Sequence, residues 1–305
     1  MGPLRGRAVR TLTVLAPGTF ASLQDAGRPG WAHVGVGHSG AADRGAHHLA
    51  NRLVGNPTDS ATIECLLGGL TARAEADVVV AVTGAPCPVR VNGRDADHHA
   101  PLYLRGGDEL SLGLPEAGLR CYVAASGGFE VDPVLGSRSW DSLAGLGPAP
   151  LRAGAVLPLG GAAADGARVD HAPVLLPTLE TLTVTVTPGP REDWVADGLA
   201  ALGERTWVVS THSDRVGVRL DGVPLLRAAA FADAELPSEG VVRGAVQVPA
   251  GGLPVVFGSD HPVTGGYPVV GVVTDADADR LAQARPGQQV RFRAAGITPR
   301  RGPSR

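Results

Sequence analysis

The chain has 305 residues, of which 44% are hydrophobic and 19% are charged, and its formal net charge is −3. This length provides for one large domain or two ordinary ones and excludes a disulfide-stapled mini-protein. The charge is small and negative, so neither nucleic acid nor a membrane surface is an expected partner.

Short apolar runs between glycine and proline residues predict a mainly β protein with a few helices. The sequence contains 43 glycines and 25 prolines, which supply the turns that such a fold needs. The predicted strands, in chain order, cover residues 12–15, 78–82, 110–114, 121–125, 181–187, 207–210, 246–248, 255–258, 269–273 and 289–293. Strands at these intervals are typical of sheets and barrels.

Three stretches have helical rather than strand periodicity: residues 40–54, 191–202 and 275–284. In the first, apolar residues recur on one helical face, Ser39 is placed to cap the start, and Asp43 falls in the first turn. The third has acidic residues at its start and a basic residue at its end, which the helix dipole favours.

A glycine- and alanine-rich stretch, residues 157–177, is the candidate boundary between two lobes. It predicts an N-terminal β-rich lobe over residues 10–170 and a C-terminal lobe over residues 178–297. The ends of the chain are rich in arginine, glycine and proline, so residues 1–8 are expected to fray and residues 298–305 to form a disordered tail.

All 27 basic side chains are arginines, because the sequence contains no lysine. A Walker A loop, Schiff-base catalysis and a covalently attached biotin or lipoyl group each require a lysine, so this chain supports none of them. Recognition of an anion therefore depends on arginine or on backbone N–H groups.

The three cysteines have neither a CxxC spacing nor a histidine at metal-ligand spacing, which predicts reduced, buried, structural thiols. The histidine pairs at 47–48 and 98–99 point in different directions on a helix or a strand, so we expect exposed histidines and no metal site. The N-terminus lacks the apolar segment of a signal peptide, and no run nears the roughly 18 apolar residues of a membrane span. We therefore expect a cytoplasmic protein.

Residues 35–40 have the pattern GxGxxG and open the first predicted helix. A dinucleotide-binding unit uses this pattern, but it also needs a buried strand before it, and residues 28–34 do not resemble one. The same stretch nearly matches the nucleophile elbow of a hydrolase, with Ala41 where a glycine is required. Two simpler interpretations stay open, a helix N-terminus that binds an anion and an ordinary capped helix.

Polar residues gather in several glycine-rich loops. Gln24, Asp25 and Arg28 lie in one loop, where they would form a substrate clamp or brace the loop internally. Asp214 and Arg215 follow Ser213 in another loop, as a local ion pair of little energetic value or, if buried, as a pair for proton transfer and anion binding. Further polar segments occur at residues 137–140, 238–240, 244–249 and 260–268, at strand ends and in turns, where β proteins often carry their sites.

These segments, in this order, resemble the carboxyltransferase-like family, also called allophanate hydrolase subunit 2. The matching residues are 22–30, 35–43, 50–56, Glu64, 127–128 and 134–139, followed by 187–190, 213–215, 238–241, 244–249 and 264–268. The similarity extends over about residues 10–295. Each motif is short, but the ordered set is specific.

The resemblance implies a cyclophilin-like β-barrel architecture in two lobes, with the barrel in the C-terminal lobe. It also implies a smaller, B-type partner subunit of related fold and an A-type subunit. In bacterial 5-oxoprolinases such subunits together open the lactam 5-oxoproline to L-glutamate with ATP and Mg²⁺. We therefore expect a subunit of this hydrolase that acts only in the complex, with the nucleotide held without a Walker A loop across a partner interface.

Two alternatives stay open. The first is a carboxyltransferase component of a biotin-dependent urea carboxylase, which would need biotin on a partner because this chain has no lysine. The second is a regulatory binding protein for the partner subunit. Both enzyme reactions activate a small planar amide, which suits a site of arginine, serine, glutamine and backbone N–H groups that polarise a carbonyl.

The family motifs and the polar loops together predict the site residues. Catalytic roles are expected for Ser213, Asp214 and Arg215. The predicted substrate-binding residues are Gln24, Asp25, Arg28, Ser39, Asp43, Ser137, Arg138, Ser139, Glu239, Gln247, Thr264, Gly265, Gly266 and Tyr267.

Overall fold

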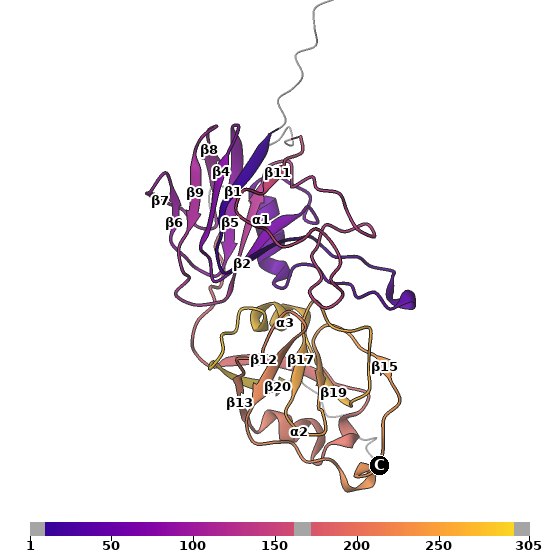
Figure 1. Ribbon diagram of the computed structural model, residues 1–305. Helices are drawn as coiled ribbons and strands as arrows, with labels where there is room; N and C mark the ends of the chain where they lie inside the picture. The colour runs from indigo at the N-terminus through magenta and orange to yellow at the C-terminus, as the bar shows by residue number, and fades with distance from the viewer. Residues whose placement is uncertain (1–9, 162–171, 296–305) are drawn as a thin grey trace, which may run out of the picture. The chain divides into compact units, whose positions relative to one another are not determined.

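The computed structural model describes residues 10–161 and 172–295 (Figure 1). The predicted frayed start, residues 1–8, and the predicted tail, residues 298–305, lie outside the described residues, as does the middle of the predicted boundary at 157–177. Among the described residues, no helix is long and apolar enough to cross a membrane.

The described chain forms two compact units. The first extends to Thr178 and the second begins at Leu179, but two short segments within the first stretch, Gly30–His38 and Ser142–Ala144, group with the second unit. The chain therefore passes between the units several times, where the sequence indicated one boundary.

Two antiparallel sheets form the first unit. One has the strand order β11-β1-β4-β9-β6-β7, with strands at Val156–Pro158, Thr11–Pro17, Leu70–Ala74, Glu109–Leu112, Val89–Val91 and Arg94–Ala96. The other has the order β2-β3-β10-β5-β8, with strands at Phe20–Gln24, Thr62–Leu66, Arg120–Ala125, Val78–Gly84 and Pro101–Leu104.

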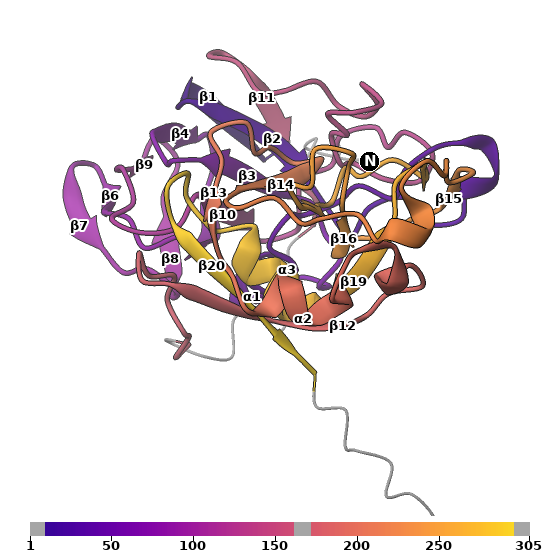
Figure 2. The ribbon, with the colours of Figure 1, turned by 90° about the horizontal axis from the view of Figure 1, so that it is seen from below.

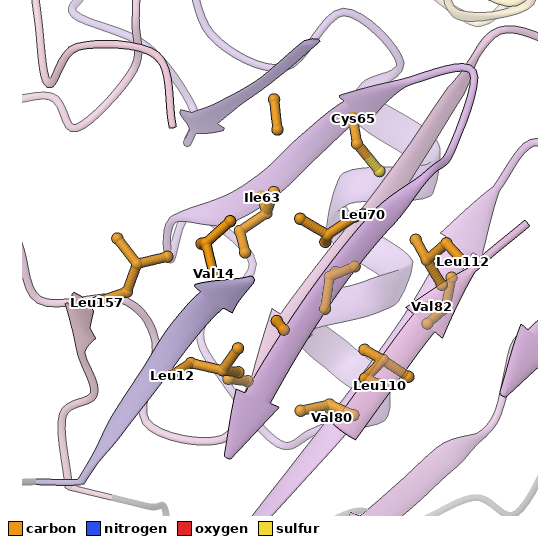
Figure 3. Close-up of a cluster of buried hydrophobic side chains, with 14 of the residues drawn as sticks. Leu12, Val14, Ile63, Cys65, Leu70, Val80, Val82, Leu110, Leu112 and Leu157 are labelled. Carbon is orange, nitrogen blue, oxygen red and sulfur yellow. The ribbon is translucent and has the colours of Figure 1, made fainter. Parts of the chain in front are cut away.

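The two sheets pack face to face over a common apolar core. Leu12 and Val14 alternate with half-buried threonines on β1 and point inward, where they meet Ile63 of β3 and Val80 and Val82 of β5 (Figure 3). All five side chains are inaccessible to solvent, and burial of each contributes about 1.5–3 kcal/mol relative to exposure. This core holds the ends of the strands, and the loops that follow them, in fixed positions.

Helix α1, Arg44–Leu53, covers the outer face of the second sheet. Leu53 and Ala50 pack against Tyr122 and Ala124 of β10, so β10 is buried on both faces along its whole length. The helix starts later than the sequence predicted: its N-cap is Asp43, whose side chain accepts a hydrogen bond from the backbone N–H of Ala46, and not Ser39.

A closed barrel forms the second unit, in the order β12-β19-β16-β17-β14-β13-β20 (Figures 1 and 2). Its strands are Leu182–Pro188, Val269–Val273, Ala245–Gln247, Val255–Phe257, Gly217–Asp221, Thr206–Val209 and Gln289–Ala294. The first and last of these in the sequence, β12 and β20, pair in parallel and close the barrel. The prediction of a mainly β fold that contains a barrel is confirmed.

Smaller elements complete the second unit. Helix α2 is Gly198–Gly203 and helix α3 is Asp275–Leu281, and a two-strand sheet pairs β15, Glu239–Gly240, with β18, Thr264–Gly265. Three 3₁₀ turns, η1 to η3, occupy Ala32–Val34, Glu192–Trp194 and Ala229–Phe231. The long helix predicted over residues 191–202 is wrong, because Asp197 adopts a left-handed backbone conformation between η2 and α2.

Candidate functional site

Asp25 is the centre of a buried polar cluster in the first unit, just after β2 ends. One carboxylate oxygen, Oδ1, accepts hydrogen bonds from the hydroxyls of Ser137 and Ser139, both at 2.6 Å, and from the backbone N–H of Gly27 at 2.8 Å. The other, Oδ2, accepts from the backbone N–H of Arg138 at 2.6 Å. The sequence placed these residues in two separate loops, and the structure joins them. We call Gln24, Asp25, Arg28, Ser137 and Ser139 the Asp25 cluster.

Arg28 contributes a buried cation to this cluster, with 1% of its surface exposed. Its Nη2 atom donates to the carbonyl oxygen of Ser139, and its Nη1 atom lies 3.7 Å from a carboxylate oxygen of Asp141. The guanidinium is thus held at one nitrogen by a main-chain carbonyl and lies near a carboxylate without a close ion pair.

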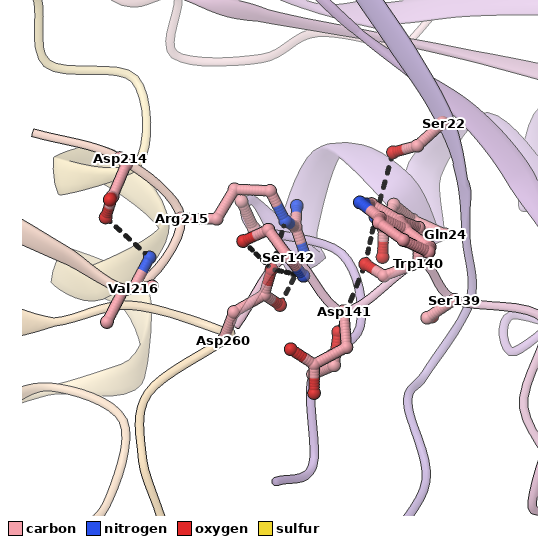
Figure 4. A network of polar contacts seen from close by, with 12 residues as sticks. Ser22, Gln24, Ser139, Trp140, Asp141, Ser142, Asp214, Arg215, Val216 and Asp260 are labelled. Carbon is pink, nitrogen blue, oxygen red and sulfur yellow. Dashed lines mark hydrogen bonds and ion pairs between the residues drawn. The ribbon is translucent and has the colours of Figure 1, made fainter. Parts of the chain in front are cut away.

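Gln24 is fully buried at the end of β2. Its Nε2 atom donates to the hydroxyl of Ser22 and to the carbonyl oxygen of Trp140, both at 3.0 Å (Figure 4). Gln24 and Arg28 therefore bind the carbonyls of two consecutive residues, Trp140 and Ser139. The carboxylate of Asp25 is occupied by protein donors, which is what an internal brace of the loop requires.

The start of α1 forms a second polar network in the same unit. The buried carboxylate of Glu64 accepts from the hydroxyl of Tyr122 at 2.7 Å and from the backbone N–H of Ala42 at 2.9 Å. The Tyr122 hydroxyl in turn accepts from the backbone N–H of Asp43 at 2.8 Å. Burial and the nearby Glu64 charge raise the pKa of Tyr122 well above its usual value, so this hydroxyl stays protonated. These bonds support the interpretation of a capped helix.

The GxGxxG segment does not begin a dinucleotide-binding unit. Ala32–Val34, directly before it, form a 3₁₀ turn and not a strand. Ser39, within the segment, has a φ angle of 55° and its hydroxyl lies 3.4 Å from the carbonyl oxygen of Trp140. Ser39 is therefore near the Asp25 cluster, but without the role of helix cap.

Some histidines are buried, in contrast to the expectation of exposed ones. The ring of His47 is inaccessible to solvent, and its Nδ1 atom lies 2.9 Å from the hydroxyl of Thr62. Burial and the neighbouring charge of His48 lower the pKa of His47 to about 4. His99 is also buried, and its Nδ1 lies 2.8 Å from that of His98, because the two residues form a bend between β7 and β8 and not a strand.

The cysteines are free, as predicted. Cys65 and Cys121 are buried and Cys87 is half-buried, with the sulfur atoms of Cys87 and Cys121 at 3.7 Å. Contacts among these thiols and their burial raise the pKa values of Cys87 and Cys121. Thiols in this state are poor nucleophiles.

A closed ion pair lies in the second unit. Arg215 donates from Nε and Nη2 to both carboxylate oxygens of Asp260, at 2.8 and 2.9 Å, and both residues are buried (Figure 4). The same carboxylate accepts from the backbone N–H and the hydroxyl of Ser142, at 2.9 and 2.7 Å. Burial alone would raise the pKa of Asp260, but the Arg215 charge and these hydrogen bonds outweigh it and hold the pKa below its usual value.

Asp214 and Arg215 have different partners in the structure, so the predicted pair between these two neighbours is wrong. Asp214 is exposed, and its Oδ1 atom accepts from the backbone N–H groups of Val216 and Gly217 within its own turn. The hydroxyl of Ser213 exchanges hydrogen bonds with the main chain of Arg219. Adjacent residues in a turn point apart, and this leaves Arg215 for Asp260.

The remaining predicted residues gather around the small β15–β18 sheet. Glu239 forms an ion pair with Arg191, which lowers the pKa of Glu239 through their hydrogen bonds. Gly265 of β18 pairs with Glu239, and the buried Gln247 donates to the carbonyl oxygen of Tyr267 at 3.2 Å. Thr264, Gly266 and Tyr267 are exposed along this edge. Most of the predicted substrate-binding residues thus form two groups, the Asp25 cluster in the first unit and this one in the second. Asp43, at the start of α1, and the predicted catalytic residues Ser213, Asp214 and Arg215 belong to neither.

Asp141, Ser142 and Asp260 contribute to these networks but were not among the predicted site residues. Asp141 and Ser142 directly follow the predicted segment 137–140, and Asp260 opens the segment 260–268. An acidic residue at the edge of each polar loop was the only signal for them. It did not indicate Arg215 as the partner of Asp260, because Arg215 is 45 positions away in the sequence.

Comparison with known proteins defines the class to which this fold belongs. Residues 34–294 match the family model described as carboxyltransferase domain, subdomain A and B. The match includes the barrel and most of the first unit, so the chain belongs to this family.

The individual relatives are of two kinds. The chain is 35% identical over 285 residues to the C-type subunit of the 5-oxoprolinase of Escherichia coli, a match that covers 92% of this chain and 90% of the relative. Among solved structures, the urea carboxylase of Kluyveromyces lactis superposes with a TM-score of 0.87 at 29% identity, over 94% of this chain and 28% of that protein. Another solved protein superposes with a TM-score of 0.84 at 32% identity, and this chain spans 56% of its length.

Proposed function

We propose that the chain is the C-type subunit of an ATP-dependent 5-oxoprolinase, which opens 5-oxoproline to L-glutamate together with A-type and B-type subunits in the cytoplasm. The similarity to the C-type subunit of Escherichia coli carries the proposal, because it extends over 90% of that relative as well as 92% of this chain. A match over nearly the full length of both proteins supports an equivalent role more strongly than a match to one part of a longer enzyme.

The chemistry of the Asp25 cluster supports the proposal. Opening a lactam requires that its carbonyl be polarised and that negative charge developing on the oxygen be stabilised. A buried guanidinium does this effectively, because a hydrogen bond from a cation is strong where water is excluded. Arg28 is a buried guanidinium of the first unit that meets this requirement, and the carbonyl oxygen of Ser139, whose hydroxyl is bonded to Asp25, holds its Nη2 atom.

The nucleotide is not assigned to this chain's described residues. Across residues 10–161 and 172–295, no group of three or more histidine, cysteine or acidic side chains is placed to hold a metal ion, and the sequence has no lysine for a phosphate. The proposal therefore names no residue of this chain as a holder of ATP with Mg²⁺, and no step of it uses the nucleotide at this chain.

The decisive experiment measures ATP hydrolysis coupled to glutamate release with 5-oxoproline as the substrate. This protein alone, the candidate A-type and B-type subunits without it, and the full mixture are compared. We expect coupled turnover in the full mixture only. Full activity of the A-type and B-type subunits without this chain would contradict the proposal.

Carboxyl transfer to urea or a similar amide is the second candidate, and the superposition on a urea carboxylase favours it. This reaction would need biotin on a partner, because the chain has no lysine to carry it. Bicarbonate fixation onto urea, measured after addition of a biotinylated carrier and its carboxylase, separates the two candidates. Activity in this assay with none on 5-oxoproline would favour the second candidate.

A third candidate, a regulatory binding protein, gives a different pattern. In that case substitutions at the predicted catalytic residues would weaken association with the partner and leave turnover per complex unchanged. Arg215→Ala and Asp214→Ala, assayed in the reconstituted complex, test this: loss of turnover in either variant with the complex intact supports a catalytic role for that residue. Because Asp214 is exposed and Arg215 is buried, the two variants separate a role in chemistry from one in folding.

A further inference from the structure

Three buried polar atoms of the Asp25 cluster lack hydrogen-bond partners among the described residues: Oε1 of Gln24 and Nε and Nη1 of Arg28. Both side chains are almost completely buried, with exposed fractions of 0% for Gln24 and 1% for Arg28. In folded proteins the large majority of buried side-chain polar atoms are paired with protein or with water, so a set of unpaired atoms in one cluster points to a further partner.

The orientation of both side chains is fixed by their other contacts. The carbonyl oxygen of Trp140 can only accept a hydrogen bond, so the Gln24 atom that faces it must be Nε2, and Oε1 must point elsewhere. Arg28 is held in the same way by the carbonyl oxygen of Ser139. The unpaired atoms are therefore one acceptor and two donors on side chains that are anchored to consecutive residues.

Neither of the two nearby carboxylates, Asp25 and Asp141, provides the missing partner. Asp25 already accepts four hydrogen bonds, from two hydroxyls and two backbone N–H groups. Asp141 lies 3.7 Å from Nη1 of Arg28, which is beyond ordinary hydrogen-bond length. A ligand that pairs with both Gln24 and Arg28 must offer an acceptor oxygen and an N–H donor.

We propose that Arg28 and Gln24 bind a compact amide, with the guanidinium donating to the amide carbonyl oxygen and Oε1 of Gln24 accepting from the amide N–H. The inference rests on the proposed function and assigns two residues to the recognition of its substrate. A lactam and urea both present this pair of groups, so the shared chemistry is the amide, and the two sources are separated by experiment.

The test compares probes that differ by one group, with the full chain and with the reconstituted complex. 5-Oxoproline, 2-pyrrolidone, N-methyl-2-pyrrolidone and urea are titrated, and binding is followed by calorimetry or ligand-observed NMR. We expect 2-pyrrolidone to bind at least tenfold more tightly than N-methyl-2-pyrrolidone, because methylation removes the N–H group from which Oε1 of Gln24 accepts a hydrogen bond. This comparison uses the unaltered protein, so it does not depend on any variant folding.

Two variants assign the preference to the named residues. Gln24→Met removes Oε1 at similar volume and should abolish the discrimination against the N-methyl probe, whereas Arg28→Met should weaken binding of all amide probes at least tenfold. Gln283→Met, at another buried glutamine, is the matched control and should keep both properties. In the complex, Gln24→Met should raise KM for 5-oxoproline more than it lowers kcat.

The outcomes separate this inference from the proposed function. Equal binding of the two pyrrolidones by the unaltered protein, or no binding of any amide by chain or complex, overturns the inference. A 5-oxoprolinase complex whose KM is unchanged by Gln24→Met also overturns it and leaves the proposed function intact. Binding of urea with loss in the Arg28→Met variant, without turnover of 5-oxoproline, supports the inference and contradicts the proposed function.

Discussion

Each unit contains a buried arginine beside a carboxylate, and the two are built differently. In the second unit, Arg215 binds both oxygens of Asp260 within 2.9 Å. In the first, Arg28 lies 3.7 Å from Asp141, and its Nε and Nη1 atoms have no hydrogen-bond partner in the described chain. The close pair of Arg215 contributes to the fold, whereas Arg28 is the arginine to which the proposal above assigns a ligand.

The largest effect is expected from breaking the closed pair. Asp260→Ala leaves the Arg215 guanidinium buried without its counter-charge, which should lower the free energy of unfolding by about 3–5 kcal/mol. Urea denaturation measures this loss. The double variant Arg215→Met, Asp260→Leu replaces both charges with apolar groups and should recover most of it. A loss below about 1 kcal/mol in Asp260→Ala would place the pair with ordinary surface ion pairs.

The next effect is a pH dependence confined to the first unit. His47 has a pKa of about 4 in the folded protein against 6.5 for an unperturbed histidine, so only the unfolded chain takes up a proton between these values. The contribution of His47 to the free energy of unfolding is therefore fully present above about pH 6.5. It falls by up to about 3 kcal/mol as the pH decreases to 4. Denaturation at a series of pH values should show this slope, and His47→Asn should flatten it.

The second unit should respond at lower pH. The pKa of Asp260 is held below 3.8, so its stabilising contribution is present above that pH and is lost as the pH falls through the lower, folded value.

The His47 prediction has a matched control. His33→Gln, at an exposed histidine, should leave the slope between pH 6.5 and 4 unchanged. An unchanged slope in His47→Asn would contradict the assignment to His47.

A smaller effect compares two aspartates that accept backbone hydrogen bonds. In Asp25→Asn, the new NH₂ group faces hydroxyl and N–H donors of the Asp25 cluster, which should lower the free energy of unfolding by about 2 kcal/mol. Asp214→Asn keeps the Oδ1 acceptor of an exposed turn and should change it by less than about 0.5 kcal/mol. Thermal or urea denaturation of both variants checks the difference, which would vanish if Asp25 were freely solvated.

The smallest effect compares the helix starts of the two units. Asp43 caps α1 through a hydrogen bond to Ala46, so Asp43→Ala should cost about 1 kcal/mol of unfolding free energy. The side chain of Thr274 makes no capping hydrogen bond at the start of α3, and Thr274→Ala should cost less. Equal losses in denaturation experiments would show that the cap of α1 carries no special weight.

Much of the fold was predictable from the sequence, because the core strands are short apolar runs with strong β preference. The strand at residues 269–273 agrees with the prediction at both ends, and that at 78–82 agrees at its start. Strands β2, β3 and β14 were missed because each mixes polar residues into a short run. Local periodicity gives no indication of such strands, whose stability comes from pairing with neighbours.

The start of α1 shows why local signals mislead at boundaries. Residues 40–42 have a composition that continues the helical face, yet the backbone N–H of Ala41 bonds to the carbonyl oxygen of Asp25, and that of Ala42 bonds to Glu64. These partners are distant in the sequence, and they draw the chain out of the helix. Asp43, followed three positions later by Ala46, was a correct cap signal that a longer predicted helix concealed.

The sequence could predict which residues belong to the candidate site, but not which of them are in contact. The loop at residues 22–30 and the segment 137–140 were both selected from the sequence, but nothing local indicates that Asp25 meets Ser137, which is 112 positions away. The same limit applies to Arg215. Its neighbour Asp214 is the nearest acidic residue in the sequence, but its partner in the structure is Asp260. Ion pairs form between groups that are close in space, and sequence distance is a poor guide to that.

The parallel pairing of β12 with β20 has a consequence for how the chain acquires its fold. Thr181, directly before β12, and Gln289, the first residue of β20, form a hydrogen bond across 108 positions of sequence. The barrel therefore cannot close until its last strand has been synthesised. Until then, β12 has no β20 to pair with. A high contact order of this kind slows folding, so the rate at which the second unit matures is expected to be governed by the arrival of β20.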